Sequence, residues 1–128
     1  MTYIDGFIMP LRDDKLGEYK PMAEMFARKA KEQGAIGSLE ALGDGLEHGH
    51  TTDFFKAVHA EDGENVVFSF VVWPDKATRD AGWEKIMADP EMQPGAMPMP
   101  FDGKRMFWGG FKPFVSSVEF AKTEKQEA

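Results

Sequence analysis

Five polar side chains are candidates for chemistry because each falls within or beside a segment that is otherwise apolar. They are Asp5, Glu40, His59, Ser69 and Arg105. Carboxylates and an imidazole in an apolar pocket can accept and donate protons near neutral pH. Each also has a structural interpretation: Asp5 pairs with Arg105 or a backbone amide, Glu40 lies at a sheet edge, and His59 sits on an exposed strand. No other catalytic signature accompanies them.

The loop over 46–52 holds Glu47, His48 and His50, which are residue types that bind metal ions. Two histidines in a flexible, glycine-containing loop lack the preformed geometry of a tight site. The chain has no cysteine, which excludes thiolate metal sites, disulfides and thiol nucleophiles. We therefore expect no metal and no cofactor.

Length and composition indicate one domain. The chain has 128 residues, 42% of them hydrophobic, which is enough for one core. We expect a single domain over 1–120 and a charged tail over 121–128. A net charge of -7 repels phosphate backbones, so nucleic acid is not an expected partner. The absence of cysteine, of a signal-like start and of an apolar run of about 20 residues favours a cytoplasmic protein that does not enter the membrane.

The segment over 64–73 organises the chain. It is rich in β-branched and aromatic residues, and Ser69 is its one interior polar side chain after Asn65. This composition is typical of a strand buried on both faces. Pro74 ends the strand, and the carboxylate of Asp75 is suited to cap a helix over 76–88.

Hydrophobic periodicity and turn residues predict the remaining elements. They are a strand over 3–11, a helix from Asp13 or Asp14 to Gly34 with a kink or a late start at Pro21, strands over 35–42, 54–60 and 104–112, and a turn over 61–63. The strand over 54–60 is expected to form a hairpin with the central strand. The Gly109-Gly110 pair predicts a bulge or the close approach of another group.

The order of these elements contains a repeat in which a strand, a proline, an aspartate and a helix follow one another. It predicts an α+β fold of the ferredoxin-like β-α-β-β-α-β type with an extra hairpin strand, in which an antiparallel sheet carries both helices on one face. Alternation places Asp5, Phe7 and Met9 together on the helix-free face. A second copy of the chain is the expected cover for this apolar area, which gives a homodimeric α+β barrel.

The segment over 91–100 is rich in methionine and proline, so we expect a loop packed at one end of the helix-free face. Flexible thioethers adapt to varied apolar shapes, and a small-molecule pocket is expected between this loop and the sheet. Its expected lining residues are Phe7, Met97, Met99, Phe101 and Trp108.

Several short motifs resemble one bacterial family. They are Tyr3-Ile4-Asp5-Gly6-Phe7, Asn65-Val66-Val67-Phe68-Ser69-Phe70, Met87-Ala88-Asp89-Pro90, Met99-Pro100-Phe101-Asp102-Gly103-Lys104-Arg105-Met106 and Gly109-Gly110-Phe111. Over nearly the whole chain the sequence resembles the DUF1428 (YbaA-like) family of the dimeric α/β-barrel superfamily. The resemblance implies the fold and the dimer and transfers no catalytic residue. A family label that links some members to signal-recognition-particle RNA is disfavoured by the acidic charge.

Two classes of function are open from the sequence. Members of the superfamily are often cofactor-independent oxygenases or isomerases, so the resemblance implies a pocket that carries out such a reaction. The alternative is a non-catalytic dimer that binds a small apolar or aromatic ligand or takes part in a stress response. Ligand binding without turnover would favour the second class.

Overall fold

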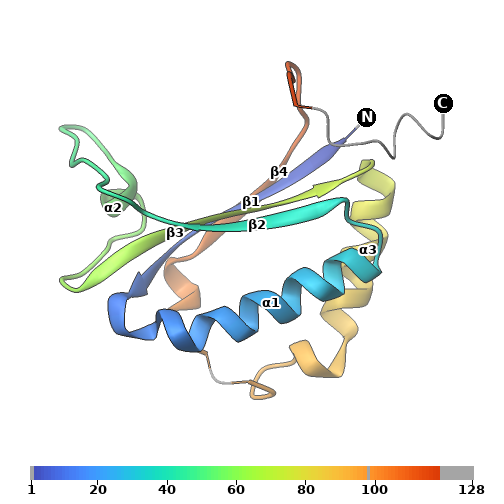
Figure 1. The fold of residues 1–128 in the computed structure, drawn as a ribbon, viewed down its shortest axis with the longest axis horizontal. Coiled ribbons are helices and arrows are strands. Elements are labelled where there is room, and N and C mark those ends of the chain that lie inside the picture. Colours follow the sequence, from blue (N-terminus) through green and yellow to red (C-terminus); the bar gives the residue numbers. More distant parts are fainter. Residues whose placement is uncertain (1, 98, 119–128) are drawn as a thin grey trace.

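A four-stranded antiparallel sheet forms one layer of the molecule. The computed structural model describes residues 2–97 and 99–118, so the expected tail over 121–128 lies outside the described residues. The strands are β1 (Tyr3–Arg12), β2 (Gly37–Leu42), β3 (Glu64–Trp73) and β4 (Phe107–Phe111). They lie in the order β2-β3-β1-β4, and every neighbouring pair is antiparallel (Figure 1). The predicted central strand is confirmed, because β3 pairs with β1 on one side and β2 on the other.

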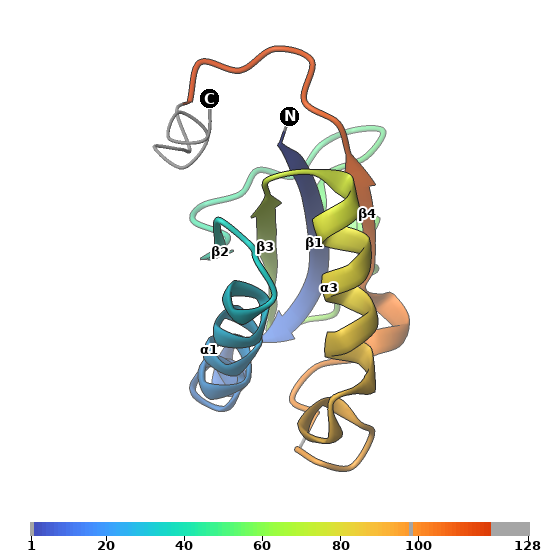
Figure 2. The same ribbon diagram turned by 90° about the vertical axis from the view of Figure 1, so that its right-hand side faces the viewer.

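Two helices, α1 (Leu16–Glu32) and α3 (Lys76–Ala88), cover one face of the sheet (Figure 2). The predicted cap of α3 is confirmed: Asp75 accepts a hydrogen bond of 2.7 Å from the backbone amide of Thr78. The predicted cap of α1 is wrong. A 3-10 turn, η1 (Asp13–Lys15), precedes α1, and Asp14 instead pairs with Arg12.

The predicted strand over 54–60, and with it the extra hairpin strand, is wrong. Residues Phe54–Ala57 form a short helix, α2. Asp53 caps this helix, because its side chain accepts a hydrogen bond from the backbone amide of Lys56. In so short a segment this local hydrogen bond favours a helical turn over an extended strand. His59 follows with a positive φ of 52°, which breaks strand geometry.

The two faces of the sheet are the reverse of the prediction. Asp5, Phe7 and Met9 point toward the helices, where Met9 packs with Tyr19 and Ala23 of α1. Alternation separates two sets of side chains correctly, but it does not say which set a helix covers. Both sets are apolar here, so hydrophobicity alone gave no basis for the choice.

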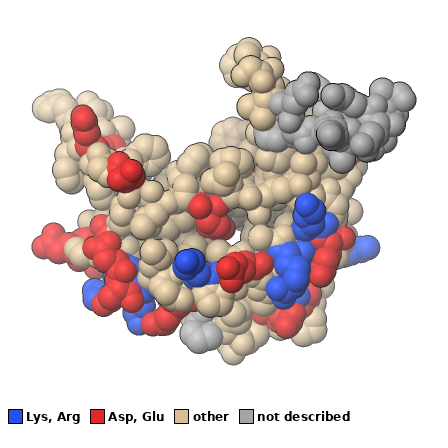
Figure 3. Space-filling model, viewed as in Figure 1, with Lys and Arg blue, Asp and Glu red and all other residues tan. Residues whose placement is uncertain are grey.

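The helix-free face remains apolar and open to solvent. Its exposed side chains are Leu39 (49%), Phe68 (46%), Phe107 (47%) and Phe111 (63%). Charged side chains of both signs instead gather mostly over the helices (Figure 3). The described chain therefore leaves one large face of its sheet without a cover.

Two glycines permit close packing around the site. A Cβ on Gly82 of α3 would come within 2.9 Å of the Trp73 ring, and one on Gly110 of β4 would come within 2.5 Å of the Tyr3 hydroxyl. The predicted bulge at the glycine pair is absent, because Gly109 and Gly110 pair in continuous register with Gly6 and Asp5. The group that approaches closely is the Tyr3 side chain.

The methionine- and proline-rich segment lies on the helix side, not on the helix-free face (Figure 1). Two 3-10 turns flank it, η2 (Pro90–Met92) and η3 (Gly103–Arg105). Lys29 of α1 fixes its start by donating to Asp89 at 2.8 Å and to Glu91 at 2.6 Å. Among the described residues, no helix is long and apolar enough to span a membrane.

Candidate functional site

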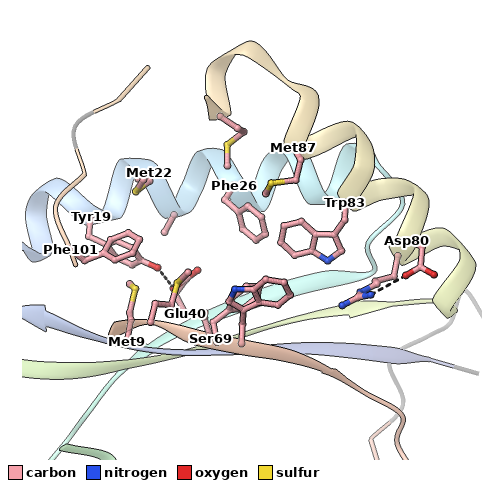
Figure 4. Close-up of a pocket in the computed structure, with 16 residues that line it drawn as sticks. Met9, Tyr19, Met22, Phe26, Glu40, Ser69, Asp80, Trp83, Met87 and Phe101 are labelled. Atoms are coloured by element: carbon pink, nitrogen blue, oxygen red, sulfur yellow. Dashed lines mark hydrogen bonds and ion pairs between the residues drawn. The ribbon is translucent and has the colours of Figure 1, made fainter. Parts of the chain in front are cut away.

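A cavity of about 470 Å³ lies between the sheet and the two long helices. Every strand contributes to it, as do α1, α3 and the segment after α3. The lining residues are Phe7, Met9, Tyr19, Met22, Ala23, Phe26, Glu40, Ser69, Arg79, Asp80, Trp83, Met87, Met92, Phe101, Met106 and Trp108. Phe26 projects from α1 and Trp83 projects from α3 into the space between the helices and the sheet (Figure 4). The cavity has the size of a small-molecule site.

Four aromatic rings form one wall of this pocket. Trp83 lies with its ring centroid 5.5 Å from that of Phe26, 6.0 Å from that of Phe7 and 6.5 Å from that of Trp108. The two indole planes are inclined by 24°. Ring contacts at these distances are favourable, and they hold the wall as one packed unit.

The polar end of the pocket is a pair formed by Tyr19 of α1 and Glu40 of β2. The Tyr19 hydroxyl donates to Glu40 Oε1 at 2.7 Å (Figure 4). Although Glu40 as a whole is exposed at the sheet edge, its carboxylate points to the buried Tyr19, and desolvation raises the pKa of Glu40 while the Tyr19 hydrogen bond opposes this shift. Burial and the nearby carboxylate hold the pKa of Tyr19 far above its usual range.

Ser69 lies directly opposite Glu40, because the two residues pair across β2 and β3. Both face the helices and both line the pocket. Of the five candidates for chemistry, these are the two that the fold brings together in the cavity. A hydroxyl and a carboxylate thus share one end of an otherwise apolar space.

Asp5 lies behind the aromatic wall and is fully buried. Its carboxylate accepts from the indole N–H of Trp73 at 3.0 Å and of Trp83 at 2.8 Å. Arg79 donates to both of its oxygens, with the shortest contact from Nη2 to Oδ1 at 2.7 Å. Asp5 therefore positions the Trp83 ring and ties α3 to the sheet.

Arg79 is a lining residue whose charge is already paired. It donates to Asp5 and, through Nη1, to Asp80 at 2.9 Å, and its guanidinium lies 5.2 Å from the ring centroid of Tyr3. The hydrogen bond to Asp5 is the main cause that holds the pKa of Arg79 above its usual range. The ion pair between Arg79 and Asp80 lies at the other end of the pocket from Glu40 (Figure 4).

Methionines supply much of the remaining lining, namely Met9, Met22, Met87, Met92 and Met106. Phe101 follows the methionine- and proline-rich segment. Its ring and that of Tyr19 pack in a T-shaped arrangement, with 5.8 Å between the ring centroids. Flexible thioethers allow such a pocket to adapt to the shape of a bound molecule.

The remaining candidates lie outside the pocket. The predicted pair of Asp5 with Arg105 is wrong, because Arg105 binds both oxygens of Glu64 at 2.7 Å and also Asp102. His59 is exposed in the turn after α2, where its carbonyl accepts from Arg105. Arg105 is the last residue of the turn η3 and binds the first residue of β3, Glu64. No local sequence pattern indicates this contact between distant segments.

The expected pocket was misplaced, although several of its residues were identified. Phe7, Phe101 and Trp108 line the cavity, whereas Met99 is 63% exposed and neither it nor Met97 is among the described lining residues. The cavity lies under the helices and receives only part of the loop.

The histidine-containing loop carries structural contacts. The His48 ring stacks on Phe55 with 4.7 Å between centroids, and Asp53 beside it is the cap of α2. Within residues 2–97 and 99–118, no three His, Cys, Asp or Glu side chains gather as they would around a metal ion.

Sequence reasoning missed Tyr19, Phe26, Arg79 and Trp83 as site residues. Tyr19 and Phe26 lie within the helix predicted from Asp13 or Asp14 to Gly34, and Arg79 and Trp83 lie within the helix predicted over 76–88. Helical spacing did not indicate that α1 and α3 leave room between them. The missing signal was the pairing of Arg79 and Trp83 with a buried carboxylate on β1.

Comparisons with known proteins show to which family this chain belongs. The family model described as a protein of unknown function, DUF1428, matches residues 2–103. The chain is 44% identical over 115 residues to "Uncharacterized protein YbaA" of Escherichia coli strain K12, covering 90% of this chain and 98% of that protein, and the same values hold for YbaA of Shigella flexneri. A designed protein, Foldit4, aligns with a TM-score of 0.43 at 11% identity over 88% of this chain and 97% of its own, a similarity too low to indicate a shared fold. The chain belongs to the DUF1428 family.

Proposed function

We propose that this protein binds a small, largely apolar molecule in the pocket between its sheet and its helices. The observation that supports the proposal is a cavity of about 470 Å³ with an aromatic and methionine lining, the Glu40 carboxylate at one end and the paired Arg79 and Asp80 at the other. Apolar surface supplies affinity in such sites, and a few polar groups fix orientation. Glu40, Tyr19 and Ser69 are the groups that orient the ligand.

A second candidate function is proton transfer at this same end of the pocket. It is favoured by the raised pKa of Glu40, since a carboxylate with a raised pKa is a stronger base toward a substrate C–H. An isomerase that acts by proton transfer begins by removing such a proton, and so does an oxygenase without a cofactor that forms a carbanion of its substrate. In this reaction Glu40 takes the proton, and the hydrogen bond that the Tyr19 hydroxyl donates holds the carboxylate in place before the transfer.

The same proposal includes a homodimer with ferredoxin-like subunits that form an α+β barrel. Its support is the strand order β2-β3-β1-β4 with two helices on one face, and the exposed apolar side chains on the other. Burying aromatic surface against a second copy removes it from water, which stabilises association. In this arrangement the ligand pocket lies on the outer, helix-covered side of each subunit.

Thermal unfolding in the presence of small aromatic compounds tests the binding proposal. A ligand raises the melting temperature of the parent chain because it binds the folded state alone. Ala23→Leu, which fills the cavity, removes the rise, whereas Ala81→Leu on the exposed side of α3 preserves it. If the compounds raise the melting temperatures of both variants equally, they bind outside the cavity and the pocket proposal fails.

Turnover separates the two candidates. Compounds that bind are incubated with the protein in deuterated water and examined for exchange of a carbon-bound proton. Exchange that Glu40→Gln abolishes supports proton transfer. Binding without exchange or other turnover leaves the protein a non-catalytic receptor.

A further inference from the structure

We propose that the natural ligand is an organic ammonium ion, a positively charged amine on an aromatic or aliphatic body. This inference rests on the proposed pocket and adds the charge of its occupant. The charge assignment follows from which charged side chains around the cavity are paired and from the aromatic rings that line it.

The carboxylate of Glu40 has no cationic partner among the described residues. Its hydrogen bond comes from the neutral hydroxyl of Tyr19, and no described Lys, Arg or His lies within salt-bridge distance of it. Arg79, the one cation among the described lining residues, is paired with Asp5 and Asp80. A bound cation therefore meets an unpaired negative charge, whereas a bound anion meets no free positive one.

The aromatic wall also favours a cation. The faces of Trp, Tyr and Phe rings attract ammonium groups, most strongly those of Trp, and the attraction grows when the site is shielded from water. Trp83 and Trp108 both line the pocket, together with Phe7 and Phe26. The Trp83 N–H donates to the Asp5 carboxylate at 2.8 Å, which increases electron density on the indole and strengthens this attraction.

The opposite end of the pocket does not cancel this preference. Two carboxylates, Asp5 and Asp80, flank the guanidinium of Arg79, so its positive charge is not free to attract an anion. Asp80 also binds Lys76 at 2.8 Å on the solvent side. With its ammonium group at Glu40, the body of the ligand lies along the methionines that line the pocket between Glu40 and Arg79.

Three probes with one aromatic body separate charge from shape: 2-phenylethylammonium, the neutral 2-phenylethanol and the anionic 3-phenylpropanoate. Isothermal titration calorimetry at pH 7.5 measures their binding to the full chain. We expect the ammonium ion to bind at least tenfold more tightly than the alcohol and the carboxylate not to bind. Ala23→Leu removes ammonium binding, which excludes general attraction to the acidic surface.

Glu40→Gln is the decisive variant, because it removes the negative charge to which the inference assigns the ammonium preference. It reduces the preference for the ammonium ion over the alcohol to about threefold or less. The control variant Glu24→Gln, an exposed carboxylate on α1, keeps the full preference.

Two results overturn the inference in distinguishable ways. Alcohol or carboxylate binding as tight as ammonium binding, and sensitive to Ala23→Leu, overturns the charge assignment and leaves the pocket proposal standing. Failure of all three probes to bind the parent chain overturns both.

Discussion

At the scale of single residues, the buried carboxylate of Asp5 determines how the site is held. Asp5→Asn keeps the shape of the side chain and removes the charge that balances Arg79. It also sets an amide N–H₂ against other donors, which are the two indole N–H groups in one orientation of the amide and Arg79 in the other. Breaking one partner of a buried ion pair costs about 3–5 kcal/mol, and we expect a loss of that size in the free energy of unfolding.

Chemical denaturation measures this loss, and Asp14→Asn is its control. Asp14 pairs with Arg12 at 2.9 Å, but both side chains are more than half exposed, at 64% and 56%. Exposed pairs contribute at most about 1 kcal/mol. Equal small effects of the two substitutions would show that Asp5 is not a structural anchor.

Glu40 gives the pH dependence of stability a definite sign. Its pKa in the folded chain is raised from the ordinary value of 4.5, mainly by desolvation. The folded state therefore holds this proton more tightly than the unfolded state. The contribution of Glu40 to stability is largest below that ordinary value and falls as the pH rises through the folded pKa.

The variant Glu40→Gln lacks this titration. We expect its stability relative to the parent to increase as the pH rises above 4.5, by no more than about 1 kcal/mol because Glu40 is exposed as a residue. Unfolding curves at a series of pH values measure the difference. A difference that runs the other way would mean that the carboxylate is stabilised in its charged form.

At the scale of elements, Gly82 sets the distance between α3 and the sheet. A Cβ at this position meets the Trp73 ring at 2.9 Å, so Gly82→Ala pushes α3 outward and strains the contacts of Arg79 and Trp83 with Asp5. Overpacking costs about 1–3 kcal/mol and outweighs the helix propensity gained with alanine.

Gly17 provides the matched control, because it lies in α1 and a Cβ at this position would meet no other group within 4 Å. Gly17→Ala is expected to raise stability by about 0.5–1 kcal/mol through helix propensity. Thermal unfolding compares the two. If Gly82→Ala also stabilises the protein, α3 is not held against Trp73 as described.

Elements with strong local signals were predictable from the sequence. The ten residues of β3 and the cap at Asp75 are encoded by β-branched composition and by a short polar side chain at the strand end. The segment that became α2 was not predictable in this way. Its aromatic pair resembles a strand, and the cap at Asp53 decides in favour of one helical turn.

At the scale of the whole molecule, the open sheet face predicts self-association. Light scattering should give about twice 14.4 kDa at micromolar concentration. Phe68→Glu, in the middle of this face, is expected to produce monomers, and Ala77→Glu, exposed on α3, is expected to preserve dimers. A monomeric parent chain would contradict the barrel arrangement.

The candidate site could be predicted only in part because it is a product of packing. Glu40 and Ser69 were identified as polar residues in apolar strands, and their opposition follows from register. Which face the helices cover depends on long-range pairings such as Arg79 with Asp5, separated by 74 positions. No local pattern records such a pairing, so both the cavity and the position of Asp5 were assigned to the wrong side.

A crystal structure of the protein saturated with a binding compound tests the central claim most directly. We predict one molecule per chain between α1, α3 and the sheet, against Trp83 and Trp108, with its polar group within hydrogen-bond distance of the Glu40 carboxylate. A saturably bound molecule found on the helix-free face, or anywhere else outside this pocket, would contradict the account.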